Sequence, residues 1–321
     1  MRAFVTGSTG FIGSHLVADL LAHGYEVTAL VRTLDRARTL PPGVNTLSGD
    51  VTKPASMRPG MRGADVIFHL AAWRAVGLRP KDYGRMRRIN VEGTRQTLEL
   101  AGELGIPRII YTSTVAVFGH THGQIVDETY RGNGLAFASE YERTKYAAHY
   151  EVAAPLQQRG LPLVIVCPGL VYGPGDTSQL TRLFRLYAHR RLPVMIGPDN
   201  ALTWAHVDDV AAGHRLAAEK GRPGETYILA GPALTYLEFF KACERATGLP
   251  APYLWLPSRL ADVMARSLRG ARLASAELLQ NLAGLSYLAR ADKAKKELGW
   301  NPRPVEAGMP ETIAWLKASQ S

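Results

Sequence analysis

The fold is decided by Thr6-Gly7-Ser8-Thr9-Gly10-Phe11-Ile12-Gly13, in which three glycines lie three residues apart. The stretch follows the apolar run Arg2–Thr6 and leads into an amphipathic pattern over Ile12–His23, which predicts a strand, a loop and a helix. The first glycine permits a tight turn, the second lets the backbone approach a pyrophosphate, and the third lets the helix pack on the strand. Because the helix N-terminus adds N–H donors and a positive dipole, the stretch predicts a dinucleotide phosphate site.

The same alternation of strand and helix continues through about residue 170. Nearly continuous apolar runs indicate strands that are covered by helices on both faces. This pattern predicts an α/β fold, a doubly wound parallel sheet of the Rossmann type. The expected strands are Arg2–Thr6, Glu26–Val31, Asn45–Gly49, Val66–Leu70, Arg108–Ser113 and Leu163–Cys167, and the expected helices are Ile12–His23, Asp82–Leu104 and Glu140–Gln158.

The 321 residues suit two domains, or one large domain with a cap. After Pro168 the regularity weakens and helical segments dominate from Leu234 onward. We therefore expect a dinucleotide-binding domain over 1–170, with a segment near 201–230 returning to it. A smaller, mostly helical substrate-binding lobe is expected over 171–321.

Composition excludes several classes of protein. The chain is 46% hydrophobic and 21% charged, which is globular composition. Its two cysteines, Cys167 and Cys243, cannot form a disulfide framework or a four-thiolate zinc site, so a reducing, cytoplasmic setting is expected. No apolar run approaches a membrane span, and no signal-peptide core is evident at the N-terminus. The net charge of +10 leaves nucleic acid, an anionic ligand or a membrane surface open, but no nucleic-acid-binding motif accompanies it.

The end of the second predicted strand bears on the choice of cofactor. NAD-binding proteins usually place an acid there, which accepts hydrogen bonds from the ribose 2′-hydroxyl. This chain has Arg32, with Arg36 and Arg38 close behind and Asp35 as the nearby acid. Because a guanidinium chelates a phosphate, we expect NADP(H) to be favoured over NAD(H).

A tyrosine and a lysine supply the candidate chemistry. Tyr141 and Lys145 are four residues apart on a predicted helix and so share a face. A nearby ammonium favours the phenolate and brings the tyrosine toward a pKa useful for proton transfer. About thirty residues earlier, Thr112, Ser113 and Thr114 place three hydroxyls at the end of a strand.

Together these motifs resemble the extended branch of the short-chain dehydrogenase/reductase family, the NAD(P)-dependent epimerase/dehydratase family. The similarity covers nearly the whole chain and is closest in look to its dihydroflavonol-reductase-like, hydroxysteroid-dehydrogenase-like and hopanoid-associated sugar-epimerase-like members. The segments that carry it, besides the glycine motif, are Gly49–Val51, His69–Ala72, Asn90–Thr94, Tyr111–Gly119, Tyr141–Lys145, Cys167–Gly175, His206–Val210 and Ala294–Pro302.

The resemblance implies roles for individual residues. Tyr141 would be the general acid/base, Lys145 would bind the nicotinamide ribose and tune Tyr141, and Thr114 rather than Ser113 would orient the substrate. The residues that would hold the cofactor are Gly7, Thr9, Gly10, Phe11, Ile12, Gly13, Arg32, Arg36, Asp50, Val51, Leu70, Ala71, Ala72, Thr112, Tyr141, Lys145, Pro168, Gly169, Leu170 and Val171.

Departures from the family pattern narrow the reaction. In the sugar-nucleotide dehydratases of the family that the chain resembles, Thr-Asp-Glu follows the active-site strand. Here Thr114 is followed by Val115 and Ala116, and neither of these side chains can move a proton. Sugar-nucleotide epimerases often have an arginine shortly before the segment that begins at His206, and this arginine binds the diphosphate of the substrate. Here Trp204 lies in that region instead, and a second tryptophan, Trp73, follows Ala71 and Ala72. This favours a reductase or dehydrogenase acting on an apolar carbonyl or alcohol. A sugar or nucleotide-sugar epimerase is the alternative, and a non-catalytic NADP-binding sensor ranks below both.

The remaining expectations concern partners. We expect a small-molecule substrate, no nucleic acid, and a homodimer formed through the helices around 82–104 and 140–158, as the resemblance suggests. A metal site at His206, Asp208 and Asp209 is not expected, because strand alternation would separate their side chains. The basic amphipathic stretch 253–275 is better explained by substrate gating or dimer packing than by a membrane surface. Residues 74–95 carry seven cations against two acids, as a solvated helix face or an anionic substrate would require.

Overall fold

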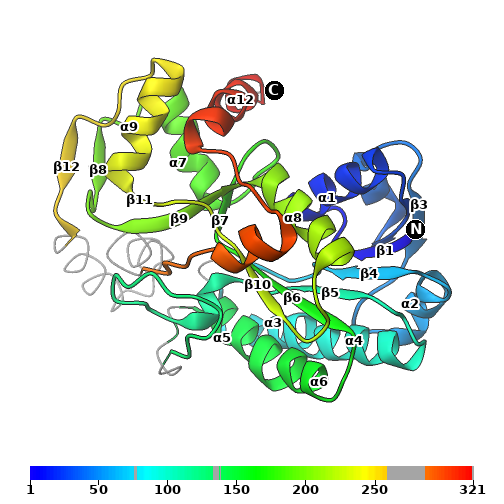
Figure 1. The fold of residues 1–321 in the computed structure, drawn as a ribbon. Coiled ribbons are helices and arrows are strands. Elements are labelled where there is room, and N and C mark those ends of the chain that lie inside the picture. Colours follow the sequence, from blue (N-terminus) through cyan, green and yellow to red (C-terminus); the bar gives the residue numbers. More distant parts are fainter. Residues whose placement is uncertain (76–77, 133–136, 138, 259–285, 320–321) are drawn as a thin grey trace.

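The computed structural model describes residues 1–75, 78–132, 137, 139–258 and 286–319. Its main sheet has seven parallel strands in the order β10-β6-β5-β4-β1-β2-β3 (Figure 1). The order reverses at β1, as in the predicted doubly wound fold. The strands of this sheet are β1 (Arg2–Thr6), β2 (Glu26–Val31), β3 (Asn45–Ser48), β4 (Val66–His69), β5 (Ile109–Thr112), β6 (Leu163–Pro168) and β10 (Thr226–Leu229).

Helices cover both faces of this sheet. On one face α1 packs against α8, and on the other α2 packs against α4 (Figure 1). Because both faces are covered, all residues of β4, β5 and β6 are buried. The helices of this part are α1 (Phe11–Ala22), α2 (Pro54–Met61), α3 (Tyr83–Arg87), α4 (Gly93–Glu103), α5 (Glu140–Ala147), α6 (Ala154–Gln158) and α8 (Val207–Lys220).

Two of the predicted helices are interrupted where the backbone widens into π-helical turns. The turn η3 (Arg88–Glu92) joins α3 to α4, and η5 (Ala148–Ala153) joins α5 to α6. Such turns recur at functional sites because they shift the side-chain register of the helix. Here they carry Asn90 and His149, which both contact the candidate site described below. Further helical turns are η1 (Leu34–Thr39), η2 (Pro80–Asp82), η4 (Val115–Phe118) and η6 (Ala294–Leu298).

The C-terminal part builds a second core. Besides helices it contains two small sheets, of order β11-β9-β7 and β12-β8. Its core is aromatic: Trp204 stacks on Phe239 with ring centroids 3.7 Å apart, and Phe184 stacks on the same ring at 5.4 Å. Its elements are β7 (Leu170–Tyr172), α7 (Gln179–Ala188), β8 (Val194–Ile196), β9 (Ala201–His206), β11 (Ala233–Thr235), α9 (Tyr236–Thr247), β12 (Leu254–Leu256) and α12 (Val305–Ala318).

The predicted six strands are confirmed, and β10 adds a seventh from the returning segment. Residues 259–275 of the predicted basic amphipathic stretch lie outside the described residues. No helix in the described part combines the length and apolar composition needed to cross a membrane.

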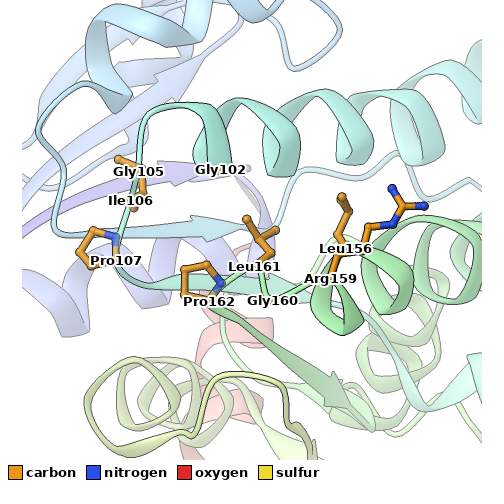
Figure 2. A pocket seen from close by; sticks show the side chains of 9 residues that line it. All are labelled: Gly102, Gly105, Ile106, Pro107, Leu156, Arg159, Gly160, Leu161 and Pro162. Carbon is orange, nitrogen blue, oxygen red and sulfur yellow. The ribbon is translucent and has the colours of Figure 1, made fainter.

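A shallow pocket of about 510 Å³ opens at the amino ends of β5 and β6 (Figure 2). Pro107 and Pro162, which precede those strands, contribute to its wall together with Arg159. Ligands of open α/β sheets bind at the carboxyl ends of the strands, which is the opposite edge. The candidate site is therefore built at that opposite edge.

Candidate active site

The glycine loop has the shape of a phosphate cradle. Gly7 adopts a φ of +73°, and a Cβ atom there would lie 2.7 Å from the backbone nitrogen of Ala71. A Cβ atom at Gly13 would lie 2.1 Å from the carbonyl oxygen of Gly7. Gly10 is the N-cap of α1 and supplies no capping side chain, so the first N–H groups of the helix face the loop without a side-chain acceptor. Thr9, Phe11 and Ile12 are partly exposed there, and the loop fits a pyrophosphate.

The expected ribose and adenine contacts lie at the ends of β2 and β3. Arg32 and Arg36 are exposed, and Arg38 pairs with Asp35 at 3.6 Å. Asp50 accepts hydrogen bonds from the backbone and hydroxyl of Thr52, both at 2.8 Å. Burial raises the pKa of Asp50. These hydrogen bonds and the charges of Lys53 and Arg32 together lower it by more than burial raises it, so the net shift is downward. Val51 beside it is buried.

The expected walls of the cofactor site line the same edge. Leu70, Ala71 and Ala72 follow β4 directly and are partly to fully exposed. The segment Pro168–Val171 passes from the buried end of β6 into β7, where Gly169 donates to the carbonyl of Leu229 at 3.1 Å. A Cβ atom at Gly169 would lie 2.7 Å from the carbonyl oxygen of Thr203, so the backbone approaches β9 closely at this point.

Tyr141 and Lys145 lie on α5, which begins with a capped N-terminus. Ser139 accepts a hydrogen bond from the backbone of Glu142 at 3.2 Å, which stabilises the first turn. The structure adds Asn90, whose role the sequence reasoning did not identify. Its amide accepts from the backbone of Trp73 at 2.6 Å and donates to the hydroxyl of Thr144 at 2.9 Å. Asn90 therefore ties the loop after β4 to the helix that carries Tyr141.

The ammonium of Lys145 is buried at the end of β5. It donates to the carbonyl oxygen of Thr112 at 2.7 Å and to the phenol oxygen of Tyr111 at 3.2 Å. It also lies 4.8 Å from the centroid of the Tyr111 ring. Burial lowers the pKa of Lys145 to about 8, because desolvation disfavours the charged form.

The three hydroxyls after β5 have different surroundings. Thr112 hydrogen-bonds to His214 at 2.9 Å, and Ser113 hydrogen-bonds to His149 at 2.8 Å; both hydroxyls are buried. Thr114 is partly exposed, and within the described part of the chain its hydroxyl accepts a long bond, 3.3 Å, from the backbone of Ala116. Its hydroxyl can therefore turn toward a substrate at less cost than that of Ser113.

Two charges act on the phenol of Tyr141. Burial raises the pKa of Tyr141, the guanidinium of Arg74 lowers it, and the carboxylate of Glu142 raises it. Glu142 is itself buried and accepts a hydrogen bond from the phenol of Tyr287 at 2.8 Å. Arg74 belongs to the basic segment 74–95, so that segment reaches the candidate site.

The two tryptophans have different environments. Trp204 is 1% exposed, stacks in the second core and donates to the carbonyl of Leu234 at 3.2 Å. Trp204 is therefore a residue of the second core, and its aromatic character does not bear on an apolar substrate. Trp73 is partly exposed, and the guanidinium of Arg85 lies 5.1 Å from its ring centroid.

The residues His206 to Asp209 do not continue a strand, so the argument from strand alternation is wrong. Strand β9 ends at His206, and α8 begins at Val207. Ligand atoms of His206, Asp208 and Glu311 lie within 4.8 Å of one another. The guanidinium of Arg303 lies 3.1 Å from Glu311 and 3.9 Å from Asp208, so a cation already neutralises these carboxylates.

His15 joins the first helix after the glycine loop to the second core. Its ring nitrogens lie 2.5 Å from Asp208 and 2.9 Å from the carbonyl oxygen of Pro174. Burial lowers the pKa of His15, but hydrogen bonds to Asp208 and Pro174 raise it more, so the net shift is upward. The protonated histidine therefore stabilises the fold below its unfolded pKa of about 6.5, and this contribution is lost as the pH rises through the folded value.

We expect His15→Gln to lower the melting temperature by about 2 °C at pH 6 and by less at pH 8. This value assumes that the partly exposed pair of His15 and Asp208 contributes roughly 1 kcal/mol to the free energy of unfolding. Thermal unfolding followed by circular dichroism across this pH range measures the difference. His23→Gln, at the exposed end of the same helix, is the control. A deficit of His15→Gln that grew toward pH 8 would contradict the assignment.

Comparisons with known proteins agree with this geometry. The model of the family described as NAD dependent epimerase/dehydratase matches residues 3–230. A Synechocystis sp. protein whose name contains dihydroflavonol 4-reductase is 32% identical over 98% of this chain and 94% of its own length. The 4-hydroxy-2-methyl-3-oxo-4-farnesyl-3,4-dihydroquinoline-1-oxide ketoreductase of Stigmatella aurantiaca is 31% identical over 94% of this chain and 92% of its own length.

A solved structure shows the same fold. UDP-glucose 4-epimerase from Thermotoga maritima, crystallised with UDP-glucose, has a TM-score of 0.79 and covers 100% of both chains at 23% identity. At that identity the likeness bears on the fold and not on the substrate.

Proposed function

The chain belongs to the NAD dependent epimerase/dehydratase family, and from this premise we propose that it is a carbonyl reductase or alcohol dehydrogenase. It is an NAD(P)-dependent enzyme of the extended short-chain dehydrogenase/reductase type, a reductase, dehydrogenase or epimerase. The observation that supports the reductase assignment is the position of the Lys145 ammonium, which donates to the carbonyl oxygen of Thr112 at the carboxyl end of β5 at 2.7 Å. Tyr141 lies on the same helix and its charge acts on the neighbouring Tyr111, and Thr114 follows β5 two residues after Thr112.

When bound, the nicotinamide ring supplies hydride to a carbonyl carbon or accepts it from an alcohol carbon. Tyr141 then donates the proton to the developing alkoxide, or removes it from the alcohol in the reverse direction. Thr114 donates a hydrogen bond to the same oxygen and fixes its position. Lys145 uses two ammonium hydrogens on Tyr111 and Thr112, which leaves the third for a ribose hydroxyl.

The substrate is proposed to be an apolar carbonyl compound or alcohol. Trp73 offers an apolar face on the loop that Asn90 ties to α5. The dehydratase reaction is disfavoured because Val115 is buried and, like Ala116, has no acidic group. Arg74, which acts on the phenol of Tyr141, would tolerate an anionic group near the reacting oxygen.

The epimerase reaction is the second candidate, because it uses the same cofactor and the fold is shared with UDP-glucose 4-epimerase. The two differ in their cofactor balance: a reductase consumes free NADPH, whereas an epimerase oxidises and re-reduces one centre with no net turnover. We would measure NADPH absorbance at 340 nm with a panel of ketones and aldehydes. Isomerisation of a sugar nucleotide without NADPH consumption would contradict the reductase assignment.

Three further proposals concern the whole molecule. We propose a homodimer through the helices around 82–104 and 140–158, a cytoplasmic location, and a division into the domains 1–170 with 201–230 and the remaining C-terminal lobe. Two separate hydrophobic cores support a division into two parts, although Trp204 belongs to the second core, and Leu298 and Trp300 belong to the first. Sedimentation at micromolar concentration measures the oligomeric state.

The proposed preference for NADP(H) rests on Arg32 and Arg36. We expect Arg32→Ala to raise the Kd of NADPH by about 10- to 100-fold, because a phosphate loses a charge-assisted hydrogen bond, and to change the Kd of NADH by less than about threefold. Fluorescence titration measures both constants. Arg38→Ala is the matched control, because Arg38 already pairs with Asp35. Equal losses for both cofactors in Arg32→Ala would contradict the assignment.

A further inference from the structure

Besides Tyr141, the candidate site contains a fully buried tyrosine, Tyr111, which accepts a hydrogen bond from the ammonium of Lys145. Tyr111 is 1% exposed, and its phenol oxygen lies 3.2 Å from the lysine nitrogen. Its ring also faces the ammonium at 4.8 Å. We propose that Tyr111 is a positioning residue for Lys145, which keeps the ammonium protonated and aimed at the carboxyl edge of β5. This inference rests on the proposed function of Lys145.

A chain of buried hydrogen bonds supports Tyr111 from behind. Its phenol group is hydrogen-bonded to Thr94, whose hydroxyl donates to the carbonyl oxygen of Asn90 at 2.8 Å. Thr94 also lies 3.0 Å from Nε2 of His69, and Nδ1 of His69 lies 2.8 Å from the hydroxyl of Thr6. All of these side chains are at most 1% exposed.

The hydrogen atoms of this chain can be assigned in one direction. Burial and the charge of Lys145 lower the pKa of His69 to about 3, so the imidazole is neutral. The hydroxyl of Thr6 accepts from the backbone of Ala71 at 3.3 Å, and so it can donate to Nδ1 of His69. The hydrogen on Nε2 then goes to Thr94, whose own hydrogen is already given to Asn90.

The phenol oxygen of Tyr111 accepts a hydrogen bond from the ammonium of Lys145, and the hydroxyl of Thr94 behind it donates to Asn90. Burial raises the pKa of Tyr111, so the phenol remains a neutral donor and acceptor. The chain thus begins at Thr6 beside the glycine loop and ends at Lys145. A satisfied buried network of this kind fixes the geometry of its last member.

The test is a direct titration of Lys145 in the cofactor-free, full-length protein. Lysine labelled with carbon-13 at Cε gives one signal per lysine, and the Lys145 signal is the one missing from Lys145→Met. We expect a pKa near 8 in the wild type. Tyr111→Phe retains the ring but removes the oxygen, and is expected to lower this pKa by about one to two pH units. The limb of the kcat/KM pH profile that follows Lys145 should move by the same amount.

Two further variants complete the experiment. Tyr150→Phe is the matched control, because this partly buried phenol lies in η5, packs at a tilt against His149, and is influenced by Arg131 rather than by Lys145. Thr94→Val removes the hydroxyl that is hydrogen-bonded to the Tyr111 phenol, and is expected to lower the pKa of Lys145 by about half a unit and to add nothing in combination with Tyr111→Phe.

A Lys145 pKa in Tyr111→Phe equal to that of the wild type would overturn the proposal. If Tyr111→Phe does not fold, an unchanged pKa in Thr94→Val would overturn it instead. The titration needs neither substrate nor turnover, so the two proposals can fail separately. A wild-type protein without reductase activity would refute the proposed function, whereas a lowered Lys145 pKa in Tyr111→Phe would still support the role of Tyr111.

Discussion

Tyr141→Phe is expected to lower kcat by about a thousandfold or more and to change the Kd of the cofactor by less than about threefold. General acid–base catalysis contributes roughly 10²- to 10⁴-fold, and phenylalanine has no proton to give. The ring is retained, so the packing of α5 is preserved. Single-turnover kinetics measures the chemical step, and fluorescence titration measures cofactor affinity.

The control for this variant, Tyr146, lies five residues further along α5. Tyr146 is partly exposed, and its ring packs at a tilt against Phe137 and Tyr150, at 5.2 and 4.6 Å between ring centroids. Tyr146→Phe also removes a phenol oxygen from α5 but leaves the proposed proton donor, Tyr141, in place, so kcat should remain within about twofold of wild type. Near-wild-type turnover by Tyr141→Phe would refute the assignment of Tyr141 as the acid/base.

Gly13→Ala is expected to weaken binding of the dinucleotide by about 100-fold or more. The new Cβ atom would lie 2.1 Å from the carbonyl oxygen of Gly7 and 3.0 Å from Cα of Ser8. Both are backbone atoms, so the loop must move away from α1. Two N–H donors to a phosphate are then misplaced, and each charge-assisted bond is worth about 1.5–3 kcal/mol. Overpacking of this kind also costs about 1–3 kcal/mol of stability.

Calorimetric titration with NADPH measures the affinity, and chemical unfolding measures the stability. Gly84→Ala is the control, because a Cβ atom at Gly84, in α3, meets nothing within 4 Å. That substitution should leave affinity unchanged and stabilise the helix by about 0.5–1 kcal/mol. An unchanged NADPH affinity in a folded Gly13→Ala protein would show that the loop does not bind the phosphates.

Much of the fold could be predicted because its signals are local. Strands β1 and β2 have the predicted bounds, since a short apolar run between turn residues leaves few alternatives. The breaks in the predicted helices could not be foreseen. The π-helical turns that carry Asn90 and His149 have no local sequence signal, because they depend on what the helix meets across the sheet.

The candidate site divides in the same way. The spacing of Tyr141 and Lys145 sets a shared helix face, and that is a local property. The distinction between Ser113 and Thr114 rests in the structure on His149, 36 residues away from Ser113. The burial of Trp204 in the second core is not a local property either, because its stacking partner Phe239 lies on a different element.

The sequence by itself determined the glycine loop, the alternation of strands and helices, and the order of hydroxyl, tyrosine and lysine. Each of these follows from backbone freedom or from periodicity within a few residues. Only the tertiary structure decided that Lys145 donates to Tyr111, that Arg74 acts on Tyr141, and that Arg303 lies among the carboxylates near His206. These contacts join elements distant in the chain, and burial sets their strength, because a charge removed from water interacts strongly with whichever groups the fold brings to it.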